Sequence, residues 1–118
     1  MGLRPRVSRL TRRMSRYSRG VAMFLVTLRR AGPEWDASRA LEEQDGWADH
    51  AAFMDGLVDQ GFIVLGGPID DVRVAHAVQA ESEDAVRATL ARDPWSYSHL
   101  RIDAVEEWEI RLDGTRRR

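Results

Sequence analysis

The segment Asp49–Pro68, DHAAFMDGLVDQGFIVLGGP, changes from one hydrophobic pattern to another within a short length. Its first part places apolar residues at helical spacing, whereas the run from Phe62 to Leu65 is continuously apolar, as in a strand that is buried on both faces. Gly61 stands between the two patterns, and glycine is common just after the end of a helix. The segment therefore predicts a helix that ends near Gly61 and a strand that follows at once.

The residues on either side complete a series of six elements. Apolar or alternating runs predict strands at 21–30, 62–68, 72–80 and 101–112. One helix is predicted over 37–60, where Gly46 permits a short helix or loop before the main helix, and a second runs from the N-cap Ser82 to a stop at Asp93-Pro94. The order β-α-β-β-α-β predicts an α+β fold of the ferredoxin-like kind, in which a four-stranded antiparallel sheet carries both helices on one face.

The sheet face away from the helices is also expected to be covered. The strand at 62–65 is apolar on both sides, and the last strand alternates through Ile102, Ala104, Trp108, Ile110 and Leu112. A chain of 118 residues has no further helix to place on this face. We therefore expect a homodimer whose two sheets face one another.

Composition and charge restrict the class of protein. The 118 residues suit a single domain, and no apolar run approaches the length of about 18 residues that a membrane span needs. There is no cysteine, so a disulfide framework and a thiol nucleophile are both excluded. Eight arginines stand against all 19 acidic residues between Val21 and Thr115, so the body lacks the basic face that nucleic-acid binding requires. We expect a cytoplasmic protein that does not bind nucleic acid.

Residues 1–20 differ from the rest of the chain. They carry seven arginines and no acidic residue, and their apolar residues fall on one helical face. The pattern fits a basic amphipathic helix for an anionic membrane surface, an organellar transit peptide, or a leader that is disordered or upstream of a true start near Val21 or Met23. We expect the last of these, because the domain pattern begins at Val21. The predicted domain then covers residues 21–113, and residues 114–118 form a basic tail.

His50 is the first candidate for chemistry. It lies three residues after Trp47 on the apolar flank of its helix, where burial readily changes the protonation of an imidazole. It is either a general base or acid, or a core histidine with a single hydrogen bond. Asp70 and Asp71 follow the strand that ends in Gly-Gly-Pro, and one of them is placed to orient the imidazole unless both are ordinary turn carboxylates.

The remaining motifs carry less chemistry. His76 alternates with valines and is expected to be structural, and no short His-x-His spacing supports a metal set that it would form with His50. The sequence has neither the Gly-x-Ser-x-Gly context of a nucleophile elbow nor a glycine-rich phosphate loop. Trp47 and Trp95 are candidates to line a pocket for a flat organic ligand, whereas packing is the stronger interpretation of Trp108.

The stretch from His50 to Pro68 resembles the YCII-like family of dimeric α+β barrel proteins. The shared pattern is a helix histidine, a glycine eleven positions later, an apolar strand and Gly-Pro. The segment ESEDAVRATLARDPW looks like the second helix of that family, and VEEW looks like its last strand, so the likeness spans about Met23 to Leu112. The resemblance implies a ferredoxin-like protomer and a dimer whose sheets enclose barrel-like pockets.

The resemblance also implies an activity. Relatives in the wider superfamily are isomerases similar to muconolactone isomerase, cofactor-free monooxygenases or dechlorinating enzymes, and the family pairs a histidine with an aspartate near the pocket. By motif position these are His50 and Asp70, while Trp47, Asp71 and Trp95 are expected to contact the substrate. We expect a lyase or isomerase that needs no cofactor and moves a proton in a small cyclic or aromatic oxygenated compound. The alternative is a non-catalytic dimer that binds a small ligand or serves as an accessory protein.

Overall fold

The computed structural model describes residues 20–116, so the expectations for residues 1–19 and for the last two residues lie outside the described range. The elements in order are β1 (Ala22–Arg30), the 3-10 turn η1 (Leu41–Glu43), α2 (Trp47–Asp59), β2 (Ile63–Pro68), β3 (Arg73–Ala80), α3 (Glu83–Leu90), β4 (Leu100–Glu107) and the 3-10 turn η2 (Gly114–Arg116). Among the described residues, no helix has both the length and the hydropathy to cross a membrane.

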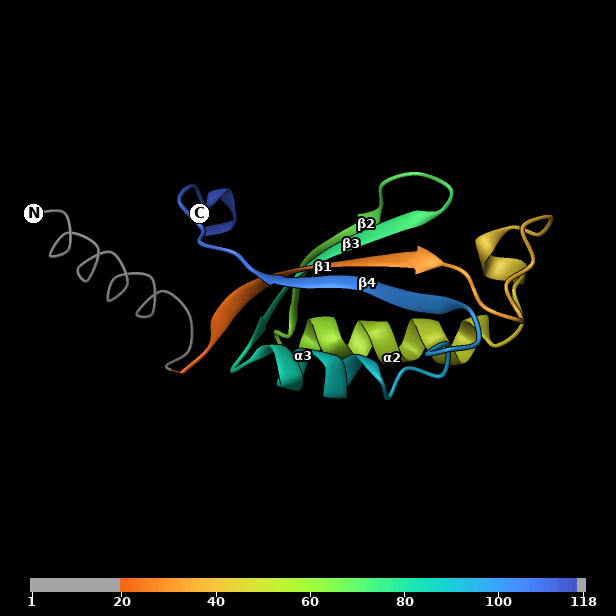
Figure 1. Ribbon diagram of the computed structural model, residues 1–118, viewed down its shortest axis with the longest axis horizontal. Coiled ribbons are helices and arrows are strands. Elements are labelled where there is room, and N and C mark those ends of the chain that lie inside the picture. The colour runs from red at the N-terminus through yellow and green to blue at the C-terminus, as the bar shows by residue number, and fades with distance from the viewer. Residues whose placement is uncertain (1–19, 117–118) are drawn as a thin grey trace, which may run out of the picture.

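The four strands form one sheet in the order β2-β3-β1-β4, and every neighbouring pair is antiparallel. Both helices, α2 and α3, lie on the same face of this sheet, and the opposite face is not covered by any described helix (Figure 1). The α+β class and the four-stranded antiparallel sheet are therefore confirmed. The narrower ferredoxin-like assignment and the dimer stay predictions.

The two helices run in opposite directions beneath the sheet (Figure 1). This follows from the sheet, because α2 returns after β1, α3 returns after β3, and these two strands are antiparallel. The start of α2 therefore lies at the same end of the sheet as the end of α3. That end brings together segments that are far apart in the sequence, and it holds the candidate site.

The helix boundaries follow local signals in the sequence. Gly46 precedes α2 with φ of 78°, a left-handed conformation that suits glycine, and the short turn η1 comes before it as one of the two expected alternatives. Gly61 follows the end of α2 with φ of 82°. The side chain of Ser82 accepts a hydrogen bond from the N–H of Ala85 at 3.1 Å, which confirms the predicted cap of α3.

The core lies between the sheet and the two helices. The apolar side chains that solvent does not reach at all are Val26, Val78 and Val86. Val26 of β1 stands opposite His76 of β3 and Val105 of β4, and paired residues of antiparallel strands point to the same side of the sheet. His76 therefore lies on the helix side together with Val74 and Val78, as their alternation predicted.

The last strand is shorter than expected. Alternation predicted a strand as far as Leu112, but β4 ends at Glu107 and Leu112 is 93% exposed. A bulge in the pairing of β1 with β4 adds one residue to β4 and interrupts its alternation. As a result Ile102 and Val105 face the helices, whereas Ala104 faces the open side. The prediction that one parity holds along the whole segment is wrong for this reason.

Candidate active site

A cavity of about 470 Å³ lies between the helix layer and the sheet, at the end where α2 begins and α3 ends. Its wall is mostly apolar and includes Leu41, Met54, Val74, Leu90, Leu100 and Ile102. Its polar lining includes His50 of α2, His76 of β3 and Asp93 of the loop that follows α3. Such a volume suits a small organic molecule, and the few polar groups are suited to fix its orientation.

His50 forms a pair with Asp93. Nδ1 of the imidazole lies 2.8 Å and 2.9 Å from the two carboxylate oxygens, and both residues are more than nine-tenths buried. Because a carboxylate accepts hydrogen bonds, this contact places a proton on Nδ1 and leaves the lone pair of Nε2 for the cavity. His50 comes from the first turns of α2, and Asp93 follows the last turn of α3. The opposite directions of the two helices therefore create the pair.

Trp95 is the centre of an aromatic stack beside this pair. Its ring centroid lies 4.1 Å from that of His50 and 4.4 Å from that of His99, and the rings are nearly parallel. The backbone N–H of Trp95 donates a 2.9 Å hydrogen bond to Asp93, while its indole Nε1 donates one of 2.9 Å to the carbonyl oxygen of Asp45. Trp95 thus holds the imidazole by stacking and the carboxylate by a backbone hydrogen bond.

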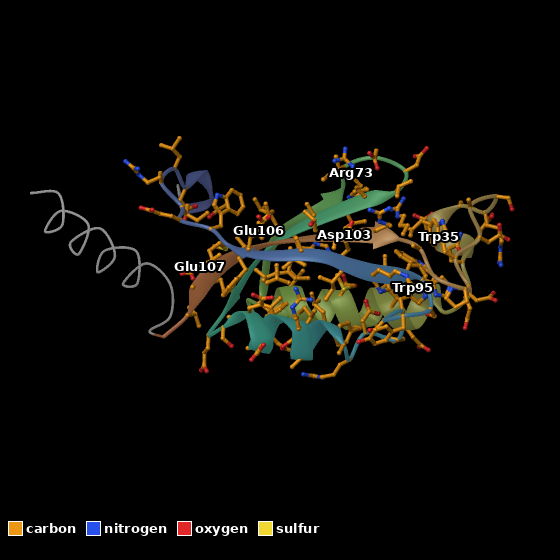
Figure 2. All side chains as sticks on the ribbon, viewed as in Figure 1. Trp35, Arg73, Trp95, Asp103, Glu106 and Glu107 are labelled. Carbon is orange, nitrogen blue, oxygen red and sulfur yellow. The ribbon has the colours of Figure 1, made fainter. Side chains whose placement is uncertain are left out.

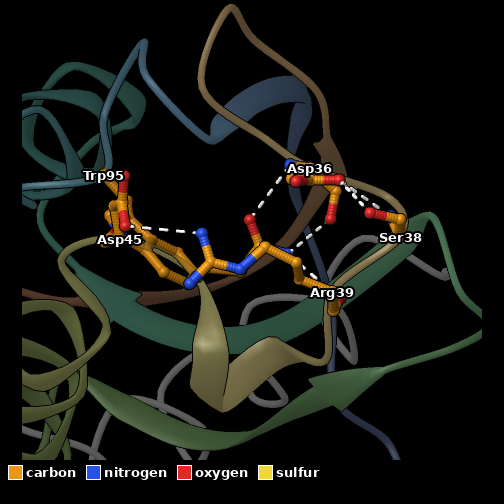
Figure 3. A network of polar contacts seen from close by, with 6 residues as sticks. Asp36, Ser38, Arg39, Asp45 and Trp95 are labelled. Carbon is orange, nitrogen blue, oxygen red and sulfur yellow. Dashed lines mark hydrogen bonds and ion pairs between the residues drawn. The ribbon is translucent and has the colours of Figure 1, made fainter.

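The loop before α2 anchors the indole. The side chain of Gln44, which is 3% exposed, accepts a hydrogen bond from the N–H of Asp36 and donates to two backbone carbonyls of the same loop. A Cβ on Gly46 would lie 3.1 Å from Nε1 of Trp95, so the lack of a side chain there admits the ring. Figure 3 shows this loop with Asp45 beside Trp95 and with the ion pair between Asp45 and Arg39.

The opening of the cavity carries three arginines with different surroundings. Arg87 is bound to Glu83 at 2.9 Å, and the guanidinium of Arg30 lies over the ring of Trp35 at 5.4 Å from its centroid. Arg101 is exposed and forms no ion pair or side-chain hydrogen bond with the described residues, but it stands opposite Arg29 and so faces the same side of the sheet as Arg73. Arg30 stands opposite Leu100 on the helix side, so it is the arginine best placed to meet an anionic group of a ligand.

The structure does not bring Asp70 to His50. Oδ1 of Asp70 accepts hydrogen bonds from the N–H groups of Val72 and Arg73, and Oδ2 binds the guanidinium of Arg73 at 2.9 Å. These hydrogen bonds, the backbone ones first, lower the pKa of Asp70 to about 2. Arg73 lies on the open side of the sheet, away from Trp95 (Figure 2). Asp70 is thus fixed in the β2–β3 turn, where water also reaches it, and Asp93 has the position that was expected for it.

Of the other residues expected to contact the substrate, two line the cavity and one does not. Trp47 lines the cavity with its ring centroid 5.9 Å from that of His50, and Trp95 lines it as part of the stack. Asp71 is exposed and does not belong to the cavity wall; its carbonyl oxygen accepts a 3.3 Å hydrogen bond from Arg30. The two tryptophans are therefore in reach of a ligand, and the side chain of Asp71 is not.

The structure changes the interpretation of two further residues, His76 and Asp93. His76, expected to be structural, lines the cavity, and burial followed by the nearby charge of His50 lowers its pKa below the ordinary 6.5, while Asp93 opposes the shift. Asp93 was interpreted only as a helix stop. The sequence signal for the role of Asp93 is the topology, since an aspartate directly after α3 must lie near the first turns of an antiparallel α2.

In the described part of the chain, no three histidine, aspartate or glutamate side chains are grouped as metal ligands would be.

Comparison with known proteins adds no assignment to this geometry. No family model, no curated protein and no solved structure matches the chain. The functional argument therefore rests on the side chains around the cavity.

Proposed function

We propose that the protein is a small enzyme of the lyase or isomerase kind that transfers a proton within a small cyclic or aromatic oxygenated compound, without a cofactor. The observation that supports this most strongly is the His50–Asp93 pair in the wall of a mostly apolar cavity of about 470 Å³. A buried imidazole that a carboxylate orients is the arrangement that general base catalysis uses.

Each member of the pair has a defined role in this proposal. Asp93 accepts the hydrogen bond from Nδ1–H of His50 and so keeps the basic Nε2 directed into the cavity. Nε2 removes a proton from a carbon next to a carbonyl group, and the resulting imidazolium, whose N–H exchanges with solvent, delivers a proton to a different carbon of the same molecule. Trp95 keeps the imidazole plane fixed, because the rings stack at 4.1 Å.

The cavity also suggests the class of substrate. Its aliphatic wall, with the rings of Trp47 and Trp95, suits a flat apolar body. Arg30, which lines the cavity from the helix side of β1, suits a carboxylate or another anionic substituent at one end of that body. A lactone or cyclic ketone with an acidic side chain has both properties.

The resemblance to the YCII-like family agrees with this proposal. It implies a histidine–aspartate pair beside a pocket in a ferredoxin-like protomer, and the chain order β-α-β-β-α-β supports such a protomer. Under this proposal the aspartate of the pair is Asp93, within the Asp-Pro that ends the second helix, and not Asp70.

We further propose that the open sheet face is the surface of a homodimer, which would complete a dimeric α+β barrel. Across the middle of this face, Ala75, Thr27 and Ala104 form a row of small side chains that would let a second sheet approach closely. Leu65, 61% exposed, lies on the same face.

Sedimentation equilibrium should give the mass of a dimer, and Ala75→Arg should reduce this mass to that of a monomer. A wild-type protein with the mass of a monomer would contradict the proposal.

Deuterium exchange provides the test of function. We expect the protein to accelerate incorporation of solvent deuterium into a β,γ-unsaturated γ-lactone such as α-angelica lactone, or into another member of a panel of enolisable lactones and cyclic ketones, as followed by proton NMR. His50→Gln should lower the rate by about 10³-fold while the thermal unfolding midpoint stays near that of the wild type.

Two results would favour the non-catalytic alternative. One is the absence of exchange above the buffer rate with every compound of the panel, combined with quenching of tryptophan fluorescence by the same compounds. The other is exchange that His50→Gln leaves unchanged. Either result would overturn the proposed proton transfer.

A further inference from the structure

We infer that His76 is a second functional residue of the cavity: a neutral imidazole whose Nε2–H donates a hydrogen bond to the carbonyl oxygen of the substrate while His50 takes the proton from carbon. The inference rests on the proposed function and adds an oxygen-binding group to it. It identifies the substrate as a compound with an enolisable carbonyl, because only such a compound develops negative charge on oxygen when a neighbouring carbon loses a proton.

The orientation of the ring is fixed by Gly66 of β2. Gly66 is the residue opposite His76 in the sheet, and a Cβ on Gly66 would overlap Nδ1 of His76, with Cε1 2.7 Å and Cγ 3.0 Å away. The Nδ1–Cε1 edge of the imidazole therefore lies over the glycine. The opposite edge, which carries Nε2, points away from β2, and His76 lines the cavity.

The position of the proton follows from burial. Nδ1 of His76 is fully buried and has no hydrogen-bond partner among the described residues, whereas Nε2 is not sealed in this way. A buried N–H without an acceptor is rarer in proteins than a buried acceptor without a donor, so the proton belongs on Nε2. Because burial, the largest cause, lowers the pKa of His76 below its ordinary value, the ring stays neutral at neutral pH and Nε2 is a donor.

The two imidazoles then have complementary tasks. Nε2 of His50 removes a proton from the carbon beside the carbonyl, the C–H electron pair becomes a C=C bond, and the carbonyl π pair moves onto oxygen. The resulting enolate oxygen accepts the hydrogen bond from Nε2–H of His76, which is stronger to an anion than to the neutral carbonyl. The imidazolium N–H of His50 exchanges with solvent, and His50 then delivers one proton, or in D2O one deuteron, to another carbon, so atoms and charge balance without an added reagent.

The test compares variants of His76 that have similar size but different hydrogen-bonding groups. His76→Leu removes the donor and fills the space, and we expect it to lower kcat for lactone exchange by about 10²-fold with little change in KM. His76→Gln offers an amide N–H near the position of Nε2 and should recover part of the lost kcat. A residue that only packs would show the reverse order, because leucine is the better core residue.

A binding experiment tests the same inference without turnover. Long-range nitrogen–proton NMR spectra of the imidazoles should show His76 neutral, with its proton on Nε2, and the enolate of tetronic acid should shift that nitrogen and bind about tenfold more weakly to His76→Leu. An Nδ1–H tautomer, or equal binding of the enolate to both proteins, would overturn the inference.

The two proposals can fail separately. If His50→Gln abolishes exchange but His76→Leu exchanges like the wild type, the proposed function stands and the role of His76 is wrong. If His50→Gln exchanges like the wild type, the proposed function is wrong, and the enolate experiment alone then decides whether His76 binds oxygen.

Discussion

The loop after α3 and the turn between β2 and β3 each hold an aspartate by backbone N–H groups, yet they place it in different surroundings. Asp93 accepts from the N–H of Trp95 and binds the imidazole of His50, and it is 7% exposed. Asp70 accepts from two N–H groups of its own turn and binds Arg73 in contact with solvent. Local geometry alone would make the two carboxylates equivalent.

The partner and the burial make the difference. Arginine keeps its proton at all ordinary pH values, so the Asp70–Arg73 pair stabilises a turn and has no proton to exchange. Histidine changes its charge near neutral pH, so the Asp93–His50 pair has a nitrogen that can accept a proton beside a cavity. A carboxylate next to a base is therefore informative about function only when its partner is titratable and a ligand can reach it.

The largest expected effect separates these two aspartates directly. Asp93→Asn should lower the rate of lactone deuterium exchange by about 10³-fold, because an amide can also donate to Nδ1 and so favours the wrong imidazole tautomer. Asp70→Asn, the matched control, should leave the rate within about twofold of the wild type, since its turn faces away from His50. Equal losses in the two variants would contradict the distinction.

A second contrast lies in two adjacent glycines of β2. Gly66→Ala should lower the exchange rate by about 10²-fold, because the new methyl group would displace the ring of His76 from its position. Gly67→Ala meets no atom within 4 Å and should retain nearly the wild-type rate. Proton NMR of the two variants would also show whether only the first one moves the imidazole resonances of His76.

The arginines at the opening provide a smaller contrast. Arg30→Ala should raise KM for lactones that carry a carboxylate by about tenfold and leave KM for neutral lactones unchanged. Arg87→Ala is the control, because its guanidinium is already bound to Glu83 at 2.9 Å. An equal rise of KM for charged and neutral substrates would show that Arg30 acts through packing instead.

The smallest expected effects are those of pH on stability. For both His76 and Asp70 the free energy of unfolding falls as pH falls, but in different pH ranges. Because the folded-state pKa of His76 is lowered, His76 costs no stability above about pH 6.5 and costs more as pH falls below that value; His76→Leu should flatten this part of the stability curve. The pKa of Asp70 is lowered to about 2, so its contribution is present above the unfolded value of 3.8 and is lost as pH falls through about 2. Thermal melts of the wild type, His76→Leu and Asp70→Asn across this range would check both signs.

Much of the fold was accessible from the sequence because its signals are local. The period of apolar residues, the glycines at 46 and 61 and the serine at 82 each act within a few residues, and they gave the class and the element order. The bulge in β4 was not accessible, because it arises from pairing with β1 across more than 70 residues. His50 was identified by its place on an apolar flank. Its partner Asp93 is 43 residues away, and only the opposite directions of the two helices bring it close.

Because Gly66 has no side chain, the residue types allowed at position 66 of β2 and position 76 of β3 depend on each other. As long as position 76 holds an imidazole in this orientation, position 66 has room for hydrogen alone, and a side chain at 66 requires a smaller residue at 76. In homologous sequences these two positions should therefore vary together, with Gly at 66 and His at 76, or with a larger residue at 66 and a smaller one at 76. Such covariation would serve as a sequence marker that separates proteins with two cavity imidazoles from those with one.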